Sequence, residues 1–141
     1  LFLMVNRGRL DIDGVELQLG YTASDSLSIY AQATHLDFGT DEPLRQRPDW
    51  RAGLSLRWAP SDKWLLDSSW LYTGETWDTS VPTGGQWLDS YNRMDTTVTF
   101  RHSDDLQVVL SVTNLFDADY HEAIGFPAPG ARARLGLRYA F

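Results

Sequence analysis

The sequence ARARLGLRYAF, residues 131–141, decides the fold class and lies at the end of the chain. Apolar side chains occupy its odd positions, Ala133, Leu135, Leu137, Tyr139 and Phe141. Its even positions hold Arg132, Arg134, Gly136, Arg138 and Ala140. A period of two places these two sets on opposite faces of one β-strand. The pattern alone also fits a soluble sandwich, but the arginine-rich face and the terminal aromatic pair favour the closing strand of a membrane barrel.

Six earlier segments alternate in the same way and are bounded by turn residues. They are residues 14–22, 27–38, 49–59, 63–74, 90–101 and 106–116. In the clearest of them, 49–59, apolar residues at 50, 52, 54, 56 and 58 alternate with Asp49, Arg51, Gly53, Ser55 and Arg57. A partial strand at 1–5 would make an eighth. The sequence therefore predicts an all-β chain with about seven to eight strands.

The connections between these segments alternate in length. Short turns at 23–26, 60–62 and 102–105 alternate with long loops at 39–48, 75–89 and 117–130. In up-and-down pairing every second connection lies at the same end, so all short turns share one rim and all long loops the other. Transmembrane barrels have this asymmetry, and strands of this length can cross the hydrocarbon when tilted. We predict an antiparallel up-and-down transmembrane β-barrel.

Aromatic residues on the apolar face fall near the strand ends. Those near the short-turn rim are Tyr21, Trp58, Trp64, Phe100 and Phe141, and those near the long-loop rim are Trp50, Trp70, Tyr72 and Phe116. Two aromatic belts around an aliphatic band are typical of membrane–water interfaces. Aromatic residues in the core of a soluble sheet would not be sorted to the strand ends in this way.

The composition excludes several classes of protein. A length of 141 residues predicts one domain, and the absence of cysteine excludes disulfides and thiolate chemistry. The net charge of −7 argues against a nucleic-acid partner. No apolar run reaches about 18 residues, so no transmembrane helix is expected. With three scattered histidines and no cysteine, we expect no metal site, no cofactor and no catalytic group.

A signature near the end points to a family. SVTNLFD at 111–117 is followed by Asp119-Tyr120, by GFPAPG at 125–130 and by the final aromatic residue. Together they resemble the C-terminal end of TonB-dependent outer-membrane receptors. NRGRLDIDGVEL at 6–17 resembles a segment that opens a mid-barrel strand in the same family.

This resemblance implies a plugged barrel of about 22 strands in the Gram-negative outer membrane, of which residues 1–141 would be the C-terminal part. No segment resembles the plug or the peptide that engages TonB, so we expect the plug to be absent. The implied function is uptake of a scarce ligand, such as a ferric siderophore or cobalamin. The implied partners are membrane lipid, the TonB system, the outer-membrane assembly machinery and a small chelate.

Two other functions remain open from the residues alone. Eight strands could close into a small barrel with a structural or adhesion role, because a barrel of that size is filled by its own side chains. Alternatively, His35 and Asp37 could serve a hydrolase active at the barrel rim, although no residue is evident as a nucleophile. We expect a transport receptor rather than an enzyme.

Candidate site residues fall into three sets. Loop aromatics and a histidine could contact the ligand: Trp77, Trp87, Tyr120, His121 and Phe126. Lumen-facing arginines could attract an anionic ligand or contact the plug: Arg51, Arg57, Arg93, Arg132, Arg134 and Arg138. The resemblance further implies that Gly136, Leu137, Tyr139 and Phe141 form a signal for the assembly machinery.

Overall fold

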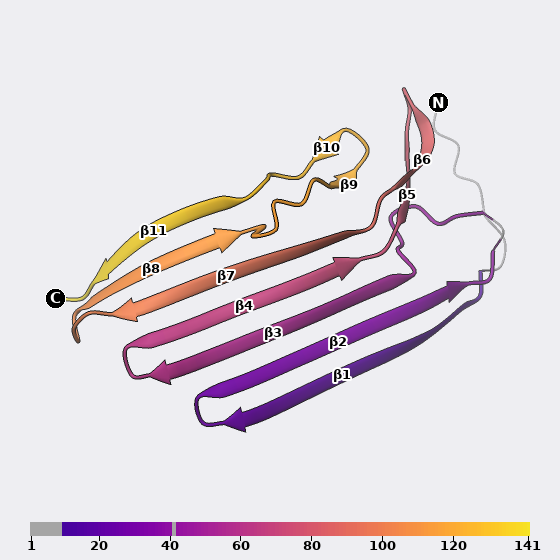
Figure 1. Ribbon diagram of the computed structural model, residues 1–141. Helices are drawn as coiled ribbons and strands as arrows, with labels where there is room; N and C mark the ends of the chain where they lie inside the picture. Colours follow the sequence, from indigo (N-terminus) through magenta and orange to yellow (C-terminus); the bar gives the residue numbers. More distant parts are fainter. Residues whose placement is uncertain (1–9, 41) are drawn as a thin grey trace.

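The alternating segments pair into one antiparallel sheet of seven strands (Figure 1). This computed structural model describes residues 10–40 and 42–141, so the expected partial strand at 1–5 lies outside the described residues. The seven strands are β1 Ile12–Ser24, β2 Leu27–Phe38, β3 Trp50–Ser61, β4 Trp64–Thr73, β7 Tyr91–Arg101, β8 Leu106–Thr113 and β11 Arg132–Tyr139. Each pairs with the next in that order, which confirms the all-β, up-and-down architecture. Within the described residues the sheet is open, with β1 and β11 at its edges.

The strand register places the apolar residues on one face throughout. Leu54 pairs with Ala31 on β2 and with Trp70 on β4, while the next residue, Ser55, pairs with Tyr30 and Ser69. The same alternation continues to the last strand. Because a shift of one residue would exchange the faces, this register confirms the division into an apolar and a polar face.

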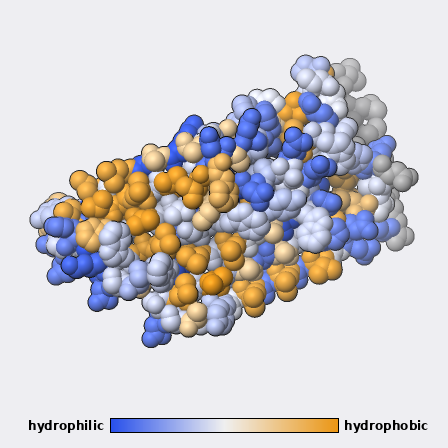
Figure 2. Space-filling view, viewed as in Figure 1, coloured by the Kyte–Doolittle hydropathy of each residue, from blue (hydrophilic) through white to orange (hydrophobic). Residues whose placement is uncertain are grey.

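Nothing in the described chain covers the apolar face. On β1, Val15 is 71% exposed and Leu17 is 65% exposed, and Leu135 and Leu137 on β11 are equally open. Figure 2 shows hydrophobic residues along the strands and hydrophilic residues concentrated at the two ends of the sheet. A soluble sandwich would bury this face against a second sheet, whereas the face of a membrane barrel meets lipid.

The short turns lie at one end of the sheet and the long connections at the other (Figure 1). The rings of Trp64 and Phe100 contact each other at the turn end, with centroids 4.6 Å apart. Eight residues further along β4, Tyr72 marks the loop end, which is a span of about 26 Å at 3.3 Å per residue. That span matches the apolar band of about 25 Å on outer-membrane barrels. No helix of the described residues is long and apolar enough to cross a membrane.

Two long connections that were predicted to be loops contain hairpins. One consists of β5 Thr76–Ser80 and β6 Gly84–Leu88, and it rises beyond the end of the sheet (Figure 1). The other consists of β9 His121–Ala123 and β10 Phe126–Pro127. Gly84 and Gly125 have φ angles of 73° and 80°, and glycine adopts these values without strain.

Two predicted strand ends were wrong. β8 stops at Thr113 rather than at 116, because Asn114 turns the backbone with a φ of 50°. β11 stops at Tyr139, so Phe141 lies beyond the strand and is fully exposed. Phe116 and Phe141, which were predicted to belong to the two aromatic belts, therefore lie outside the paired strands.

Candidate functional site

The most enclosed side chains lie at the loop end of the sheet. Six of the described residues are buried there. Two of them are Pro48 and Gly74, and of the other four Asp78 is 1% exposed, Asn114 3%, Tyr120 6% and Thr73 8%. Three of the four are polar, and no buried side-chain nitrogen or oxygen in the described part of the chain lacks a hydrogen bond. Buried polar groups that are fully bonded fix a single geometry. The loop end is therefore where side chains are enclosed and hydrogen-bonded, whereas most of the sheet is exposed on its apolar face.

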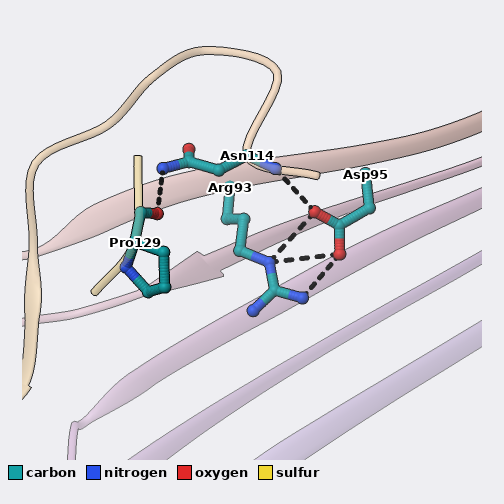
Figure 3. A network of polar contacts seen from close by, with 4 residues as sticks. All are labelled: Arg93, Asp95, Asn114 and Pro129. Carbon is teal, nitrogen blue, oxygen red and sulfur yellow. Dashed lines mark hydrogen bonds and ion pairs between the residues drawn. The ribbon is translucent and has the colours of Figure 1, made fainter. Parts of the chain in front are cut away.

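Asn114 anchors the loop that follows β8 (Figure 3). Its backbone N–H donates to Asp95 Oδ1 at 2.9 Å, and its Nδ2 donates to the carbonyls of Ala118 at 2.9 Å and Pro129 at 3.1 Å. Its Oδ1 accepts from the N–H of Ala118 at 3.0 Å. One side chain thus joins both ends of the loop, and its αL backbone conformation is one that Asn tolerates well.

Asp117 completes this anchor three residues later. Its Oδ1 accepts the N–H of Ala131 at 2.7 Å, and its backbone φ is 50°. The two polar residues of the Asn-Leu-Phe-Asp signature therefore hold the 117–131 loop from both sides. Leu115 and Phe116 between them are exposed, 46% and 56%.

Arg93 lies beneath this anchor on the polar face of β7. Its guanidinium group binds Asp95 through both Nε and Nη2, the bidentate geometry that suits arginine and carboxylate (Figure 3). It also interacts with the side chain of Tyr120, whose ring stacks on Tyr91 with centroids 3.9 Å apart. Arg93, Asn114 and Tyr120 line a small pocket of about 210 Å³, together with Thr113, Pro129 and Arg132.

Asp78 joins three separate connections. Its Oδ1 accepts from Arg45 Nε at 2.6 Å, in the 39–49 loop, and its Oδ2 accepts from the N–H of Ile124 at 2.9 Å, in the β9–β10 hairpin. Its own strand contributes the N–H of Thr79 at 2.8 Å. The bond from Arg45 and then the bond from Ile124 lower the pKa of Asp78 from 3.8 to about 2, against the opposing effect of burial. The carboxylate is ionised at neutral pH.

A cavity of about 450 Å³ lies between these connections and the polar face. Strand residues Arg51, Thr73 and Tyr91 form its floor. Gln46, Thr76 and the 121–123 strand form its sides. This mouth cavity is lined by the guanidinium of Arg51, the imidazole of His121, the phenol of Tyr91 and the carboxylates of Asp89 and Glu122. These groups can donate hydrogen bonds to a polar ligand and accept hydrogen bonds from it.

The five residues predicted to contact the ligand do not lie in one site. His121 is exposed and shares the mouth cavity with Arg51. Trp77 and Trp87 pair edge to face across the β5–β6 hairpin, 5.4 Å apart, and Trp87 lines a different, larger pocket with His35 and Trp50. Phe126 is 72% exposed at the tip of the last hairpin. Tyr120 is buried in its stack on Tyr91, so it does not present its ring to the loop surface.

The lumen-facing arginines also differ in their partners. Arg57 pairs with Asp67 at 3.2 Å, and Arg93 pairs with Asp95. Arg132, Arg134 and Arg138 project from β11 opposite Thr113, Ser111 and Gln107, and no ion pair is found for these three among the described residues. The edge of the sheet therefore carries a column of uncompensated positive charge.

His35 lies on the apolar face, opposite the arginines, and its ring is already in contact with neighbouring residues. Its ring stacks on Trp50 with centroids 4.4 Å apart, and its Nδ1 lies 3.2 Å from the carbonyl oxygen of Asp49. The register places it beside Trp50 at the end of the apolar face. A general base must face a nucleophile or a water molecule, and this histidine instead packs in the interfacial belt. No cluster of three or more metal-binding side chains occurs among residues 10–40 and 42–141.

The residues of the expected assembly signal lie along β11. Gly136 pairs with Val109, Leu137 with Val108 and Tyr139 with Leu106. Leu137 and Tyr139 are 74% and 64% exposed on the apolar face. One edge of this strand carries no partner within the described chain.

A family model described as "TonB dependent receptor-like, beta-barrel" matches residues 2–115. The chain belongs to this family. TonB-dependent receptors are β-barrel proteins of the outer membrane, and the uncovered apolar face and its two rims agree with that location. The predicted membership, fold class and location are thereby confirmed.

Among characterised relatives, the vitamin B12 transporter BtuB of Photobacterium profundum is 30% identical over 122 residues, covering 84% of this chain and 20% of the relative. The fold is similar to the ferric-catecholate import receptor Fiu from E. coli K12, with a TM-score of 0.77, 20% identity and coverage of 92% and 21%. It is also similar to the siderophore receptor PiuA from Acinetobacter baumannii, with a TM-score of 0.73, 19% identity and coverage of 92% and 22%. The chain spans about a fifth of the length of each of these three proteins.

Proposed function

We propose that residues 1–141 form part of the wall and outer mouth of a TonB-dependent receptor that takes up a ferric siderophore or cobalamin. Family membership supports a role in ligand uptake. The mouth cavity, which is lined in part by Arg51, Tyr91 and His121, is the observation that supports a ligand site in these residues. Polypeptide outside these residues would supply the plug, the contact with TonB and the remaining strands of a barrel of about 22.

The arginines of β11 support an anionic or strongly polar ligand. Within the cavity Arg51 is accompanied by the carboxylates of Asp89 and Glu122, so the arginine column of β11, rather than the cavity, would draw a negatively charged chelate toward this wall. His121 would contact the ligand inside the mouth. Trp77, Trp87 and Phe126 would contact its apolar parts above the mouth, since aromatic loop residues bind such surfaces with little loss of entropy.

Two ligand classes fit this mouth. The relative with 30% identity transports vitamin B12, which favours a corrinoid. The solved structures with the same fold include receptors for siderophores, which favours a ferric chelate. Both classes present hydrogen-bonding groups together with apolar surface, so a cavity lined by one guanidinium, one imidazole and two carboxylates, with indoles nearby, suits either.

An uptake assay tests this proposal. Cells that express the receptor containing residues 1–141 are supplied with labelled cyanocobalamin or with labelled iron in catecholate and hydroxamate chelates. We expect energy-dependent uptake of one class. A combined Arg51→Ala and His121→Ala change should raise the half-saturating concentration about tenfold or more. Arg101→Ala, at the turn end of β7, is the control. Uptake of no probe, or uptake unaffected by the double change, would contradict the proposed site.

A further inference from the structure

The mouth cavity has walls from three connections that are distant in sequence. Gln46 comes from the 39–49 loop, Thr76 from the β5–β6 hairpin, and His121 to Ala123 from the β9–β10 hairpin. Among the residues that the structure describes, no sheet hydrogen bond joins one of these connections to another, because β5–β6 and β9–β10 are separate two-stranded sheets. Their relative positions therefore depend on side chains and on a few isolated backbone bonds.

One carboxylate reaches all three walls. The donors to Asp78 stand next to the lining residues: Arg45 precedes Gln46, Ile124 follows Ala123, and Thr79 lies on the strand that begins at Thr76. A backbone bond from Gln46 N–H to the carbonyl of Trp77, 2.8 Å long, supports the first of these connections. The bond to Ile124 is the hydrogen bond that joins the β5–β6 and β9–β10 hairpins among the described residues.

The surroundings make this carboxylate difficult to replace. Asp78 is 1% exposed, and both of its oxygens are occupied by donors from different segments. An amide at this position would keep one acceptor and would turn an NH₂ group toward a donor. Leaving a buried donor without an acceptor costs more than a typical hydrogen bond contributes.

We propose that Asp78 is a positioning residue that assembles the ligand cavity from three independent outer loops. It does not itself line the cavity; it fixes the distance between the β5–β6 hairpin, the 39–49 loop and the His121 strand. The expected effect of Asp78 on ligand affinity rests on the proposed function. The coupling of the loops stands on the hydrogen bonds alone.

Distances between spin labels test the coupling directly. Labels can be placed at Val81→Cys, which is fully exposed on the β5–β6 turn, and at exposed Pro127→Cys on β10. Residues 1–141 contain no cysteine that would compete for the label, and any cysteine elsewhere in the receptor is first replaced by serine. In the complete receptor we expect a narrow distance distribution. Asp78→Asn should broaden it severalfold, whereas Asp119→Asn, the same change at a carboxylate outside this junction, should leave it narrow. An unchanged distribution in Asp78→Asn would overturn the proposal.

A second variant tests the contribution of one cavity wall by itself, and it also serves if Asp78→Asn fails to fold. Arg45→Ala removes the donor from the 39–49 loop but leaves Asp78 bonded to Ile124 and Thr79. A label pair at Arg47→Cys and Val81→Cys should then broaden, while the Val81–Pro127 pair stays narrow. Equal broadening of both pairs would indicate a general loss of structure and would contradict the segment-by-segment role.

Binding of cyanocobalamin and of a ferric catecholate gives the functional readout. For the probe that the parent receptor binds, Asp78→Asn should weaken affinity about tenfold, because ordering of the loops would then oppose binding. Asp119→Asn should bind as the parent does. Unchanged affinity together with broadened distances would refute the role in ligand positioning. If the parent binds neither probe, the proposed function fails, while the distance measurements still decide whether Asp78 couples the loops.

Discussion

The backbone N–H of Asn114 donates to Asp95 Oδ1 across 2.9 Å, at the point where β8 leaves its partner β7. Asp95 also forms an ion pair with Arg93, so the end of β8 is attached to an ion pair on the neighbouring strand β7. This arrangement gives the Asn-Leu-Phe-Asp signature a structural explanation. It stops the strand, turns the chain and holds the following loop.

Removing the Asn114 side chain should loosen the last loop. Asn114→Ala loses the bonds to Ala118 and Pro129 and strains the positive φ, so we expect a loss of about 1–3 kcal/mol in the free energy of unfolding. Asn114→Gly should recover only the part due to φ. Asn92→Ala, at an exposed position of β7, is the control. Denaturant titration of the refolded receptor in lipid vesicles measures the difference, and equal stability of all three variants would contradict the anchor.

Charge on the two faces of β3 should have unequal effects. Leu54 lies at mid-strand on the apolar face, so Leu54→Arg should cost about 2–4 kcal/mol of stability in a bilayer. Ser55→Arg, one residue further on, points to the polar face and should cost little. Both are compared by vesicle unfolding titration, and similar losses would refute the assignment of the faces.

Deleting Phe141 should affect membrane assembly more than stability. The residue lies beyond the end of β11 and is fully exposed, so its packing contribution in the described chain is small. If Gly136, Leu137, Tyr139 and Phe141 form a signal for the assembly machinery, the deletion should strongly reduce the receptor inserted in the outer membrane. Protein refolded in detergent should remain nearly as stable as the parent. Insertion at the parent level would exclude the signal.

Coupling of the loops through Asp78 should persist in mild acid. The folded pKa, about 2, lies below the ordinary value of 3.8. The stabilisation is therefore fully present above the unfolded pKa and is lost as the pH falls through the folded pKa. The Val81–Pro127 label distance should remain narrow from pH 7 to about 4 and broaden only toward pH 2. Broadening that is complete by pH 5 would show that another group controls the loops.

Residues 1–141 alone should not transport. Coupling to TonB requires a plug and its N-terminal peptide, for which residues 1–141 contain no similar segment. Cells that express only these residues should show no energy-dependent uptake of cyanocobalamin or ferric chelates, with the complete receptor as the positive control. Uptake by the isolated segment would overturn the proposed division of roles.

The sheet was predictable because each spanning strand repeats a two-residue pattern over many residues. Leu54 and Ser55 lie on opposite faces of the sheet because apolar and polar residues alternate along β3, and this alternation can be read from the sequence. The two loop hairpins were not predictable, because their strands have five residues or fewer and lie between glycines and prolines. The predicted end of β8 was wrong because the turn is made by the long-range contacts of Asn114.

The candidate site was only partly predictable. Arg51 and His121 were identified by residue type and do share a cavity. Asp78 gave no signal in the sequence, since its partners Arg45 and Ile124 are 33 and 46 residues away. Tyr120 looked like an exposed loop aromatic because the sequence gives no sign of its stack on Tyr91.

The shared carboxylate of Asp78 also limits how such a receptor can diversify. A surface loop that contacts only its own strands can be exchanged without disturbing its neighbours. Here the 39–49 loop, the β5–β6 hairpin and the β9–β10 hairpin meet at one residue, so a graft of any one of them must bring a compatible donor or acceptor. Changes in ligand preference would then have to arise as coordinated sets of substitutions across all three segments. Engineering the mouth by single-loop replacement would first meet the problem of rebuilding that junction.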